Sequence, residues 1–355
     1  MDVGLSSEQL SLRDAVRDIL RAECPPDAAR QALTDPERWR APWKTIVDLG
    51  WTELAAPAGD YGPVELAVVL EECGAALAPI PLLSSVGLAA GALRGSGLDA
   101  VLADIAGGAV ATLAVHSPGS RLPGAPATLR DGRLRGRAVA VPNASRAELI
   151  VTLATAGDGV MVAVARCDSS SGVTIAAGES TDPAQPVADV EIDAEPLATA
   201  PVDLESALTA PLVAAAADLV GVASAALHRS VEHAKARRQF GTPIGAFQGI
   251  KHALADNYVG VERARSLTYA AAARLGDLGA APADAWTAAA LAKAAAGDAA
   301  ANCARTAVQV HGALAQTWEH DIHLYVRRAW QGAAMLGDSR ALYHEVGRRF
   351  AGGAR

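Results

Sequence analysis

VEHAKARRQFGTPIGAFQGIKHALAD, residues 231–256, joins two helical patterns through a corner rich in glycine and proline. The first pattern runs into Arg237 and Arg238, and the second resumes at Phe247 and Gln248. A planar guanidinium beside the backbone amides of such a corner suits the oxygens of a phosphate or pyrophosphate, and the side-chain amide of Gln248 adds a donor. The alternative interpretation is that Arg237 only offsets the dipole at a helix carboxyl terminus.

Outward from this junction, the sequence divides into three zones of different periodicity. Residues 6–93 repeat apolar side chains at helical spacing, beginning with a capping box at Ser6-Ser7-Glu8-Gln9. Residues 108–201 hold short β-branched runs separated by Asp-Gly and Gly-Asp corners, which are typical of hairpins. From Leu204 the pattern is helical again. We therefore expect an α+β multidomain chain, with an N-terminal helical domain over 1–105, a small antiparallel β domain over 106–202 and a C-terminal domain like a four-helix bundle over 203–355.

The expected carboxy-terminal helices are long and rich in alanine. Hydrophobic residues make up 51% of the chain but aromatic residues only 4%, so cores built from Ala, Val and Leu are expected. Small side chains let helices approach closely, which favours a packed bundle. The helical patterns cover residues 204–238, 247–275, 282–312, 319–331 and 341–350.

Charge and cysteine content argue against several classes of protein. The formal net charge is −8 over 355 residues, whereas a nucleic-acid-binding protein would carry a basic face. The four cysteines (Cys24, Cys73, Cys167 and Cys303) lie far apart and have neither disulfide-framework nor metal-site spacing. The first residues lack a basic stretch followed by an apolar one. We therefore expect a cytoplasmic protein with neither a nucleic-acid nor a membrane partner.

A second unusual stretch is AVQVHGALAQTWEHDIHLYVRRA, residues 307–329. Gln309 and Gly312 stand at the end of a long helical pattern, where backbone can approach a ligand closely, although Gly312 suits an ordinary helix cap equally well. Glu319 and His323 have the i,i+4 spacing of a helical metal site. No third ligand is evident in the sequence, so we interpret this pair as a solvated helix face and expect no metal.

Both stretches resemble patterns of the acyl-CoA dehydrogenase family. RRQFGTPIGAFQGIKHALAD is similar to the family pattern R-x-x-F-G-x-x-I-x-x-F-Q-x-x-x-H-x-x-A-D. QVHGALAQTWEHDIHLYVRRA resembles the family's Q-x-x-G-G segment, with Ala313 where the second glycine is usual. Nearer the amino terminus, LSSEQLSLRDAVRDIL, LGWTELAAPAGDYG and VVLEECGAALAPIP also resemble family patterns. The resemblance covers nearly the whole chain and implies the acyl-CoA dehydrogenase fold.

The resemblance implies FAD as cofactor, bound across a subunit interface. In the family, the arginine, phenylalanine and glutamine motif of one subunit grips the pyrophosphate and adenosine end of the FAD seated in its neighbour. The matching positions of this chain are Arg237, Phe240, Gln248, Gln309 and Gly312. The anion expected at the glycine-rich corner is therefore FAD pyrophosphate, bound on behalf of another subunit.

The commoner position of the family's catalytic base holds no acid in this chain. The family reaction needs a carboxylate that removes the α-proton of an acyl-CoA while the β-hydrogen leaves to the flavin as hydride. Leu336 occupies the base position, in AAMLGDSRALY, and leucine cannot take a proton. Asp338 lies two residues further on and is a weak candidate for a displaced base.

The family's alternative base position also departs from the pattern. It falls near Pro211, where Thr209, Ala210 and Leu212 replace the usual acidic and arginine residues. Asp218 could serve only if the alignment were shifted by two helical turns. In the middle domain Pro118, Gly119 and Ser120 keep part of the segment that embraces the flavin ring, but RAVAVPNAS replaces the family's tryptophan segment.

The phosphate-end motif is thus kept, whereas the base and the ring cradle are altered. The leading hypothesis is a base-lacking subunit that completes the FAD site of a homologous partner. It resembles subunits of actinobacterial α2β2 acyl-CoA dehydrogenases, which desaturate the CoA thioesters of steroid side chains. Three alternatives remain open: a self-sufficient homotetramer that uses Asp338, a non-enzymatic scaffold on the same fold, and a related flavin oxygenase or oxidase.

Overall fold

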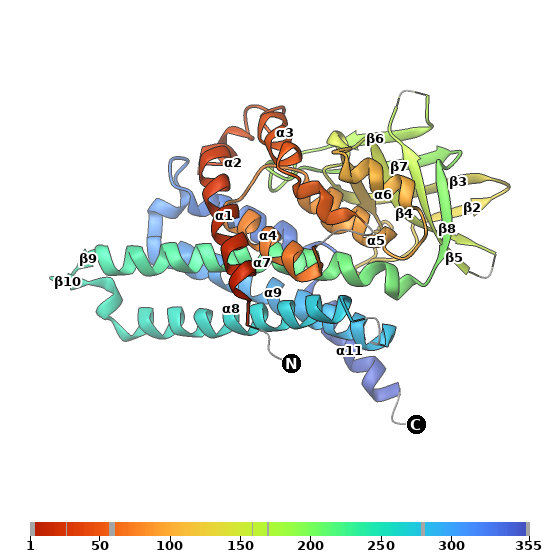
Figure 1. Ribbon diagram of the computed structural model, residues 1–355. Helices are drawn as coiled ribbons and strands as arrows, with labels where there is room; N and C mark the ends of the chain where they lie inside the picture. Colours follow the sequence, from red (N-terminus) through yellow and green to blue (C-terminus); the bar gives the residue numbers. More distant parts are fainter. Residues whose placement is uncertain are drawn as a thin grey trace.

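The computed structural model describes residues 4–25, 27–56, 61–157, 159–168, 170–277 and 281–352. Figure 1 shows the amino-terminal helices packed beside a β sheet, with the long carboxy-terminal helices running beneath both. The predicted order of helices, then strands, then helices is confirmed. Secondary structure changes between Ala106 and Ala111 and between Val202 and Leu204. The exact domain limits remain predictions.

The amino-terminal part is helical, as expected. Its elements are α1 (Ser7–Glu23), α2 (Asp27–Gln31), α3 (Arg40–Asp48), η1 (Trp51–Ala55), α4 (Pro63–Ala75), η2 (Leu83–Ala90), α5 (Gly91–Leu93) and α6 (Asp99–Ala106). The predicted capping box is present: the Gln9 amide donates to Ser6 Oγ at 3.2 Å, and the Ser6 amide donates to Gln9 Oε1 at 3.0 Å. Residues 57–60, in the middle of one family-like segment, lie outside the described residues.

The middle part of the chain is a β sheet whose first strand contacts the buried helix η2. Its elements are β1 (Ala111–Ala114), β2 (Ala127–Arg130), β3 (Arg133–Pro142), η3 (Ala144–Arg146), β4 (Leu149–Ala156), β5 (Gly159–Arg166), β6 (Val173–Ala177), β7 (Val187–Ala194) and β8 (Ala198–Val202). The Asp-Gly corner forms a two-residue hairpin in which Asp131 and Gly132 have φ of 51° and 73°. The hydroxyl of Ser85 on η2 donates to Ala111 O and accepts from Ala111 N, which ties this helix to the sheet.

The sheet is mixed, whereas the sequence predicted an antiparallel one. Its order is β6-β7-β3-β2-β4-β5-β8, and β1 also pairs with β4. The pairs β1–β4 and β2–β4 are parallel, and the other neighbours are antiparallel. A parallel pair needs a crossover connection, and β3 with η3 carries the chain back across the sheet before β4 begins. Asp-Gly corners in a sequence mark hairpins but not such crossovers.

The carboxy-terminal part contains the expected long helices. Its elements are α7 (Leu204–Ala236), β9 (Arg238–Gln239), β10 (Thr242–Pro243), η4 (Ile244–Ala246), α8 (Gln248–Leu275), α9 (Pro282–His311), η5 (Gly312–Gln316), α10 (Ile322–Ala334) and α11 (Ser339–Gly352). The start of α10 differs from the predicted 319, so Glu319 and His323 do not share a helix. Arg30 donates to the carbonyls of Trp318 and Glu319, both at 3.0 Å, which holds this backbone outside the helix.

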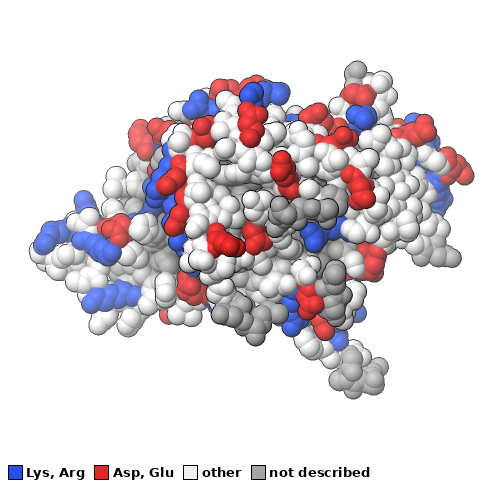
Figure 2. Space-filling view, in the orientation of Figure 1, with Lys and Arg blue, Asp and Glu red and all other residues white. Residues whose placement is uncertain are grey.

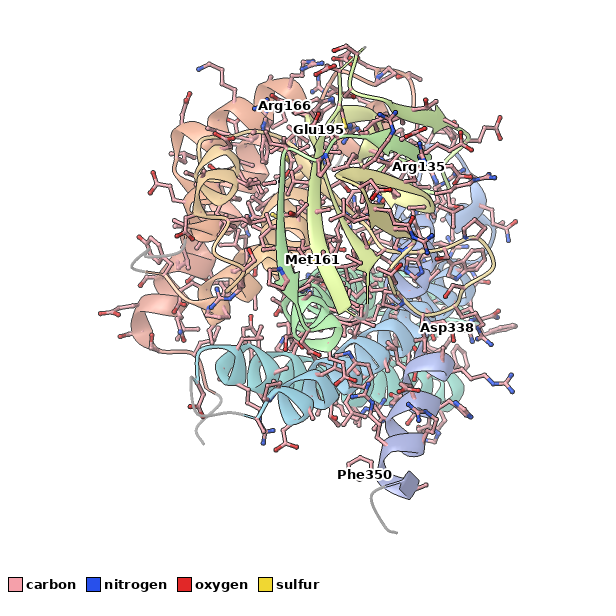
Figure 3. All side chains as sticks on the ribbon, turned by 90° about the vertical axis from the view of Figure 1, so that its right-hand side faces the viewer. Arg135, Met161, Arg166, Glu195, Asp338 and Phe350 are labelled. Carbon is pink, nitrogen blue, oxygen red and sulfur yellow. The ribbon has the colours of Figure 1, made fainter. Side chains whose placement is uncertain are left out.

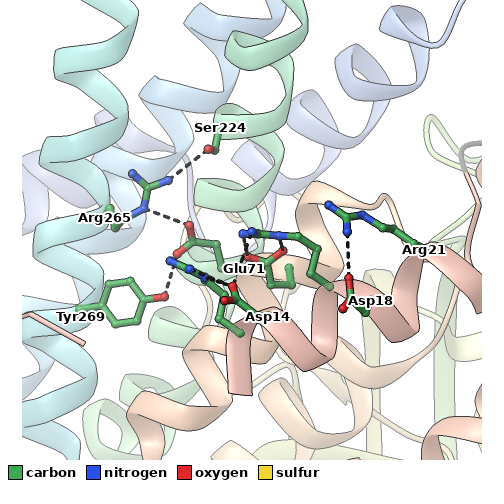
Figure 4. A network of polar contacts seen from close by, with 10 residues as sticks. Asp14, Asp18, Arg21, Glu71, Ser224, Arg265 and Tyr269 are labelled. Carbon is green, nitrogen blue, oxygen red and sulfur yellow. Dashed lines mark hydrogen bonds and ion pairs between the residues drawn. The ribbon is translucent and has the colours of Figure 1, made fainter. Parts of the chain in front are cut away.

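Two glycines let the amino-terminal helices approach α7 closely. A Cβ at Gly74 would lie 2.0 Å from Asp218 O, and one at Gly221 would lie 1.9 Å from Glu71 O. Figure 4 shows the polar contacts beside this crossing, where Glu71 accepts hydrogen bonds from Arg265 at 3.0 Å and from Tyr269 at 2.9 Å. The close approach expected from the small side chains is therefore realised between α4 and α7.

Helix α7 is the central helix of the fold. By length and composition it could cross a membrane, but 83% of its most apolar window is buried inside the protein. Its Asp218 belongs to a buried ionic cluster in which Arg328 of α10 contacts Asp182 closely and Asp218 at 3.5 Å. Burial raises the pKa of Asp218 to about 6, although the charge of Arg328 opposes this shift. This cluster joins α7, α10 and the segment before β7.

Candidate functional site

The predicted phosphate-binding corner stands at one end of the molecule. We call residues 237–248, which join α7 to α8, the tip; Figure 1 shows its hairpin β9–β10 at the far end of α7. Arg237 caps α7 at its carboxyl terminus, and its exposed side chain makes no ion pair or hydrogen bond with another described residue. Figure 2 shows Lys and Arg side chains gathered at this end of the molecule. The tip therefore presents to solvent a positive charge that is not paired with another described residue.

The aromatic residues of the tip are also exposed. Phe240 has φ of 51° and is 94% exposed, and its ring meets Phe247 edge to face at 6.1 Å. Gln248 begins α8 and is exposed as well. A Cβ at Gly241 or Gly249 would have no neighbour within 4 Å, so the backbone is open on this side. An exposed apolar ring beside a guanidinium that has no partner in the described chain is typical of a surface that a ligand or second chain covers.

The structure brings the second predicted stretch next to the tip. Gly312 ends α9 with φ of 62°, a conformation that favours glycine. The preceding His311 packs against His233, one turn before Arg237, with ring centroids 4.3 Å apart. Gln309 is exposed and lies one turn before Gly312 on α9. The end of α9 and the end of α7 therefore form one continuous surface.

Three histidines underlie this surface, and no pattern in the sequence predicts their clustering. His320 meets His311 with ring centroids 4.9 Å apart, and His311 Nδ1 lies 2.8 Å from Ala307 O. Burial lowers the pKa of His233 and of His311, and neighbouring positive groups lower each further. His233 and His311 therefore favour the neutral form at neutral pH.

A second candidate region is a pocket between the sheet and the loop that joins α10 to α11. We call it the junction pocket; its volume is about 500 Å³. Figure 3 places Asp338 where the sheet meets the carboxy-terminal helices. The polar and aromatic residues that line it include His116, Ser120, Arg121, Trp330, Gln331 and Asp338. Sequence reasoning missed His116 and Arg121, which lie in the segment AVHSPGSRLPG but match no pattern used there.

Leu336 lines the junction pocket at the predicted base position. It is 2% exposed and has φ of 55°. Its backbone amide donates to His116 Nε2 at 3.1 Å, so the lone pair of this imidazole is already engaged. Burial, followed by the charge of Lys293, lowers the pKa of His116. Position 336 therefore holds an apolar side chain, and the lone pair of the neighbouring His116 Nε2 already accepts a hydrogen bond.

Asp338 is held in a structural role beside this pocket. Its carboxylate forms an ion pair with Arg121 at 2.7 Å and accepts from the Ala341 amide at 3.0 Å, which caps α11. Partial burial opposes ionisation, but the hydrogen bonds from Arg121 and Ala341 and the charge of Arg121 lower the pKa of Asp338 overall. A carboxylate stabilised in this way is a weak proton acceptor.

The other predicted base position lies in a tightly packed region. Pro211 is buried in α7, and a Cβ at Gly91 would lie 3.2 Å from Pro211 Cδ. The space between η2, α5 and α7 has a volume of about 30 Å³, and its lining is apolar apart from Arg94. The Thr209 hydroxyl donates a hydrogen bond to Glu205 O at 2.7 Å. Asp218 is buried against Arg328 rather than exposed in this space.

The predicted remnant of the ring cradle is a turn at the mouth of the junction pocket. Gly119 has φ of 78°, and the Ser120 hydroxyl donates to Leu122 O at 2.6 Å. The segment RAVAVPNAS forms part of β3, where the pairing with β7 shifts between Ala138 and Val141. Aliphatic side chains, among them Val139, Ala140 and Val141, line this edge of the pocket in place of the family's tryptophan segment.

Lys293 fixes the loop that carries Leu336. This fully buried lysine donates to Ala333 O and Gly337 O, both at 2.7 Å, and burial lowers its pKa to about 7. The folded-state pKa lies below the ordinary 10.5, so the unfolded chain binds one more proton between these values. The Lys293 contribution to stability therefore rises with pH through this window and is lost as the pH falls.

Lys293→Met should remove this pH dependence. Relative to the wild type, we expect the slope of unfolding free energy against pH to fall by about 1.4 kcal/mol per unit between about pH 7.5 and 9. Denaturant titrations at several pH values measure the slope. Lys44→Met, which changes an exposed lysine on α3, is the matched control and should keep the wild-type slope. An unchanged slope in Lys293→Met would show that the buried amine stays protonated.

Glu319 and His323, which have the i,i+4 spacing of a helical metal site in the sequence, do not share a helix. His323 stacks on Trp318 at 5.6 Å, and its Nε2 lies 3.3 Å from Trp318 O. Asp321 is engaged with Arg30 at 2.7 Å and Arg229 at 3.2 Å. Among the described residues, no group of three or more His, Cys, Asp or Glu side chains could hold a metal ion.

Comparison with known proteins places these features in one family. The acyl-CoA dehydrogenase N-terminal domain model matches residues 6–103, and the acyl-CoA dehydrogenase C-terminal domain model matches residues 204–350. Acyl-CoA dehydrogenase IpdE2 of Mycolicibacterium smegmatis is 33% identical, over 95% of this chain and 96% of the relative. Acyl-CoA dehydrogenase FadE27 of Mycobacterium tuberculosis is 29% identical over 99% of both chains.

Solved structures agree with these sequence matches. A chain of the ChsE4-ChsE5 complex from Mycobacterium tuberculosis superimposes with a TM-score of 0.87 and 27% identity over 99% of both chains. A chain of the Tcur3481-Tcur3483 steroid ACAD gives a TM-score of 0.87 and 28% identity over 98% of both chains. The chain therefore belongs to the acyl-CoA dehydrogenase family, whose members are FAD-dependent flavoproteins.

Proposed function

We propose that this chain is the base-lacking subunit of a heteromeric α2β2 acyl-CoA dehydrogenase and completes the FAD site of a homologous partner subunit. The observation that carries the proposal is an asymmetry between its two candidate regions. At the tip, Arg237 makes no ion pair or hydrogen bond with the rest of the described chain, and Phe240 is 94% exposed. At the junction pocket, the base position holds a buried leucine. The chain thus offers a grip for a cofactor but no carboxylate at the place where protons are taken.

The tip fits the phosphate end of FAD. Arg237 would pair with the pyrophosphate, because an unpaired guanidinium matches its oxygens. Phe240 and Gln248 are exposed beside it, and the backbone around Gly241 is open. Gln309 and Gly312 would complete the grip from the end of α9. Because the tip stands at the end of a helix roughly 50 Å long, the cofactor it holds would be seated mainly in another subunit.

The proposed reaction is α,β-desaturation of an acyl-CoA thioester. FAD, when bound, accepts the β-hydrogen as hydride, and a carboxylate must take the α-proton. In this chain Leu336 cannot take it, and Asp338 is tied to Arg121 and to the cap of α11. The space beside the other base position is narrow, with a volume of about 30 Å³, and no carboxylate lines it. Proton removal is therefore assigned to the partner, and this chain alone would be inactive.

The named relatives support the kind of partner and substrate proposed. One structural neighbour is the ChsE4-ChsE5 complex, and another, Tcur3481-Tcur3483, is described as a steroid ACAD; each name pairs two differently named chains. By analogy we propose that this chain acts with a homologous partner subunit in the cytoplasm. The proposed substrate is an acyl-CoA with a steroid-derived side chain. The alternative of a self-sufficient homotetramer that uses Asp338 is disfavoured by its ion pair and lowered pKa.

Flavin content tests the proposal directly. The chain is purified alone and together with a homologous acyl-CoA dehydrogenase chain as the candidate partner. We expect a colourless protein alone and one FAD per heterodimer in the complex. One FAD per chain with turnover of an acyl-CoA by the chain alone would overturn the proposal. Asp338→Asn would then decide whether the displaced aspartate is the base, because loss of turnover with FAD retained would identify it. If no partner yields flavin, the scaffold alternative is favoured.

A further inference from the structure

A cavity of about 300 Å³ lies where the amino-terminal helices α1 and α4 meet α7 and α10. We call it the α1–α7 pocket. Small apolar residues from α4 and α7, among them Ala75, Ala76 and Ala225, line its walls, and Tyr325 lines it from α10. No described residue lines both this pocket and the junction pocket, and none of its lining residues belongs to the tip. The proposed function therefore does not use it.

Helix α1 turns one stripe of side chains toward the α1–α7 pocket. Arg17, Leu20, Arg21 and Cys24 have the i, i+3, i+4, i+7 spacing of a single helix face, and all four line the cavity. Leu20 and Cys24 are 2% and 3% exposed and form an apolar floor. Burial raises the pKa of the Cys24 thiol to about 12, so the thiol stays neutral and adds to this floor. Two arginines therefore border a buried apolar surface.

Both acids of the pocket already accept hydrogen bonds from arginines. Glu72 is 7% exposed, and its two carboxylate oxygens accept from Arg17 at 2.7 and 3.0 Å. Asp321 accepts through one oxygen from Arg30 at 2.7 Å and through the other from Arg229 at 3.2 Å. A cationic ligand would therefore find no unpaired carboxylate among the described residues that line the pocket.

Two side chains from different helices retain donors for a ligand. Arg21 of α1 donates through Nη1 to Asp18 at 2.8 Å, a pair visible in Figure 4, and its Nε and Nη2 have no partner among the described residues. The two side chains are 70% and 72% exposed, so solvent screens this pair and it holds Arg21 weakly. His228 of α7 is exposed and makes no hydrogen bond or ion pair with another described residue. Its imidazole carries an N–H donor in either protonation state.

Engaged acceptors, available donors and an apolar floor together favour an acid with an apolar body. The oxygens of a carboxylate can accept from both Arg21 and His228, and a planar guanidinium matches their geometry. Carbon atoms of the same ligand would cover Leu20 and Cys24, which removes apolar surface from water. Ligand pockets usually measure about 300–1,000 Å³, so this one suits a small acid rather than a dinucleotide or a coenzyme thioester.

We propose that the α1–α7 pocket binds a small organic carboxylate, with its anionic head between Arg21 and His228 and its apolar part on Leu20. Such a ligand contacts α1 of the amino-terminal part and α7 of the carboxy-terminal bundle at once, so it stabilises the folded chain by mass action. The inference goes beyond the proposed function and does not rest on it, because neither the tip nor the junction pocket contributes a side chain to the site.

Calorimetric titration of the full chain with hexanoate tests the site without reading flavin or turnover. We expect one saturable site per chain and no binding of hexylamine, which has a similar apolar part and the opposite charge. Acetate should bind at least about tenfold more weakly, because it lacks most of the apolar part. Inorganic phosphate should also bind more weakly than hexanoate. Absence of saturable hexanoate binding, equal binding of hexylamine, or tighter binding of phosphate would overturn the proposal.

Substitutions in the pocket locate the bound acid. Arg21→Gln should raise the hexanoate dissociation constant about tenfold, because it removes the charged donor. Ala225→Leu adds carbon atoms to the cavity without a change of charge and should weaken binding at least as much. Arg13→Gln removes another arginine of α1, which pairs with Asp14 outside the pocket, and should keep the wild-type affinity. Thermal unfolding without ligand shows whether each variant folds.

The same variants distinguish this pocket from the junction pocket. If hexanoate bound in the junction pocket, Arg21→Gln and Ala225→Leu would both keep the wild-type affinity, and that result would overturn the proposal. If Ala225→Leu did not fold, His228→Ala would replace it, since this residue is exposed and should tolerate the change. His228→Ala should raise the dissociation constant roughly threefold, as expected for the loss of one neutral donor.

Discussion

Replacing Arg237 with glutamate should leave the proposed heteromeric complex nearly free of flavin. A charge-assisted hydrogen bond contributes about 1.5–3 kcal/mol, and the glutamate would add repulsion toward the pyrophosphate. Since about 1.4 kcal/mol corresponds to a factor of ten, we expect FAD affinity to fall roughly a hundredfold. Titration of the flavin-depleted complex with FAD, followed by the change in flavin fluorescence, measures this loss independently of turnover.

A matched charge reversal distinguishes local contact from net charge. Arg166 is exposed at the end of β5, where Figure 3 labels it, and Figure 1 shows β5 at the opposite end of the molecule from the hairpin β9–β10. Arg166→Glu changes the net charge equally and should keep FAD affinity within about threefold of the wild type, a change below 0.7 kcal/mol. If Arg237→Glu behaved like Arg166→Glu, the tip would not grip the cofactor, and the proposed function would lose its principal support.

Replacing Arg328 with leucine should destabilise the fold severely. Arg328 is 2% exposed and lies between two buried carboxylates, Asp182 and Asp218. Removing one partner of a buried ion pair costs about 3–5 kcal/mol, because the remaining charge has neither water nor a counter-ion. Whole proteins have only about 5–15 kcal/mol of stability, so much of the variant should be unfolded or insoluble at neutral pH. Denaturant titration of the soluble fraction measures the loss.

The pH dependence of this variant identifies the cause. Burial raises the folded-state pKa of Asp218 to about 6, above the ordinary 3.8, so the folded protein binds the extra proton between these values. The associated stability is present at low pH and is lost as the pH rises through about 6. Loss of the arginine removes the opposing charge and widens this window, so the variant should be relatively more stable at acidic than at alkaline pH.

A surface pair provides the control for Arg328. Arg348 on α11 forms an ion pair with Glu345 at 2.7 Å, and its side chain is 66% exposed. Arg348→Leu removes the same charge and should lower the free energy of unfolding only slightly, because exposed pairs are solvated and screened. If Arg328→Leu were no more harmful than Arg348→Leu, the buried cluster would contribute no net stability.

Much of the fold could be predicted from local patterns in the sequence. The capping box at Ser6, the Asp131-Gly132 hairpin and the long Ala-rich helices all form where the sequence predicted them. In these cases the determinant lies within a few residues of the element. The parallel pairing of β4 and the late start of α10 were not predicted, because each depends on a partner distant in sequence.

The candidate site divides in the same way. Arg237, Phe240 and Gln248 could be singled out because their types and spacing form a contiguous motif. The histidine contact that joins this motif to Gly312, the Lys293 support beneath Leu336 and the ion pair of Asp338 with Arg121 could not. These residues come from separate segments, and only packing makes them neighbours.

The sequence by itself determined the order of elements, the phosphate-end motif and the absence of an acid at position 336, because these are properties of residue type and local spacing. The tertiary structure alone decided that Leu336 is buried with its amide on His116, that Asp338 caps α11, and that the space beside Pro211 is nearly filled. It also decided that the tip stands exposed at the end of α7. Burial, ion pairing and cavity volume depend on contacts between distant segments, and these contacts cannot be inferred from a single sequence.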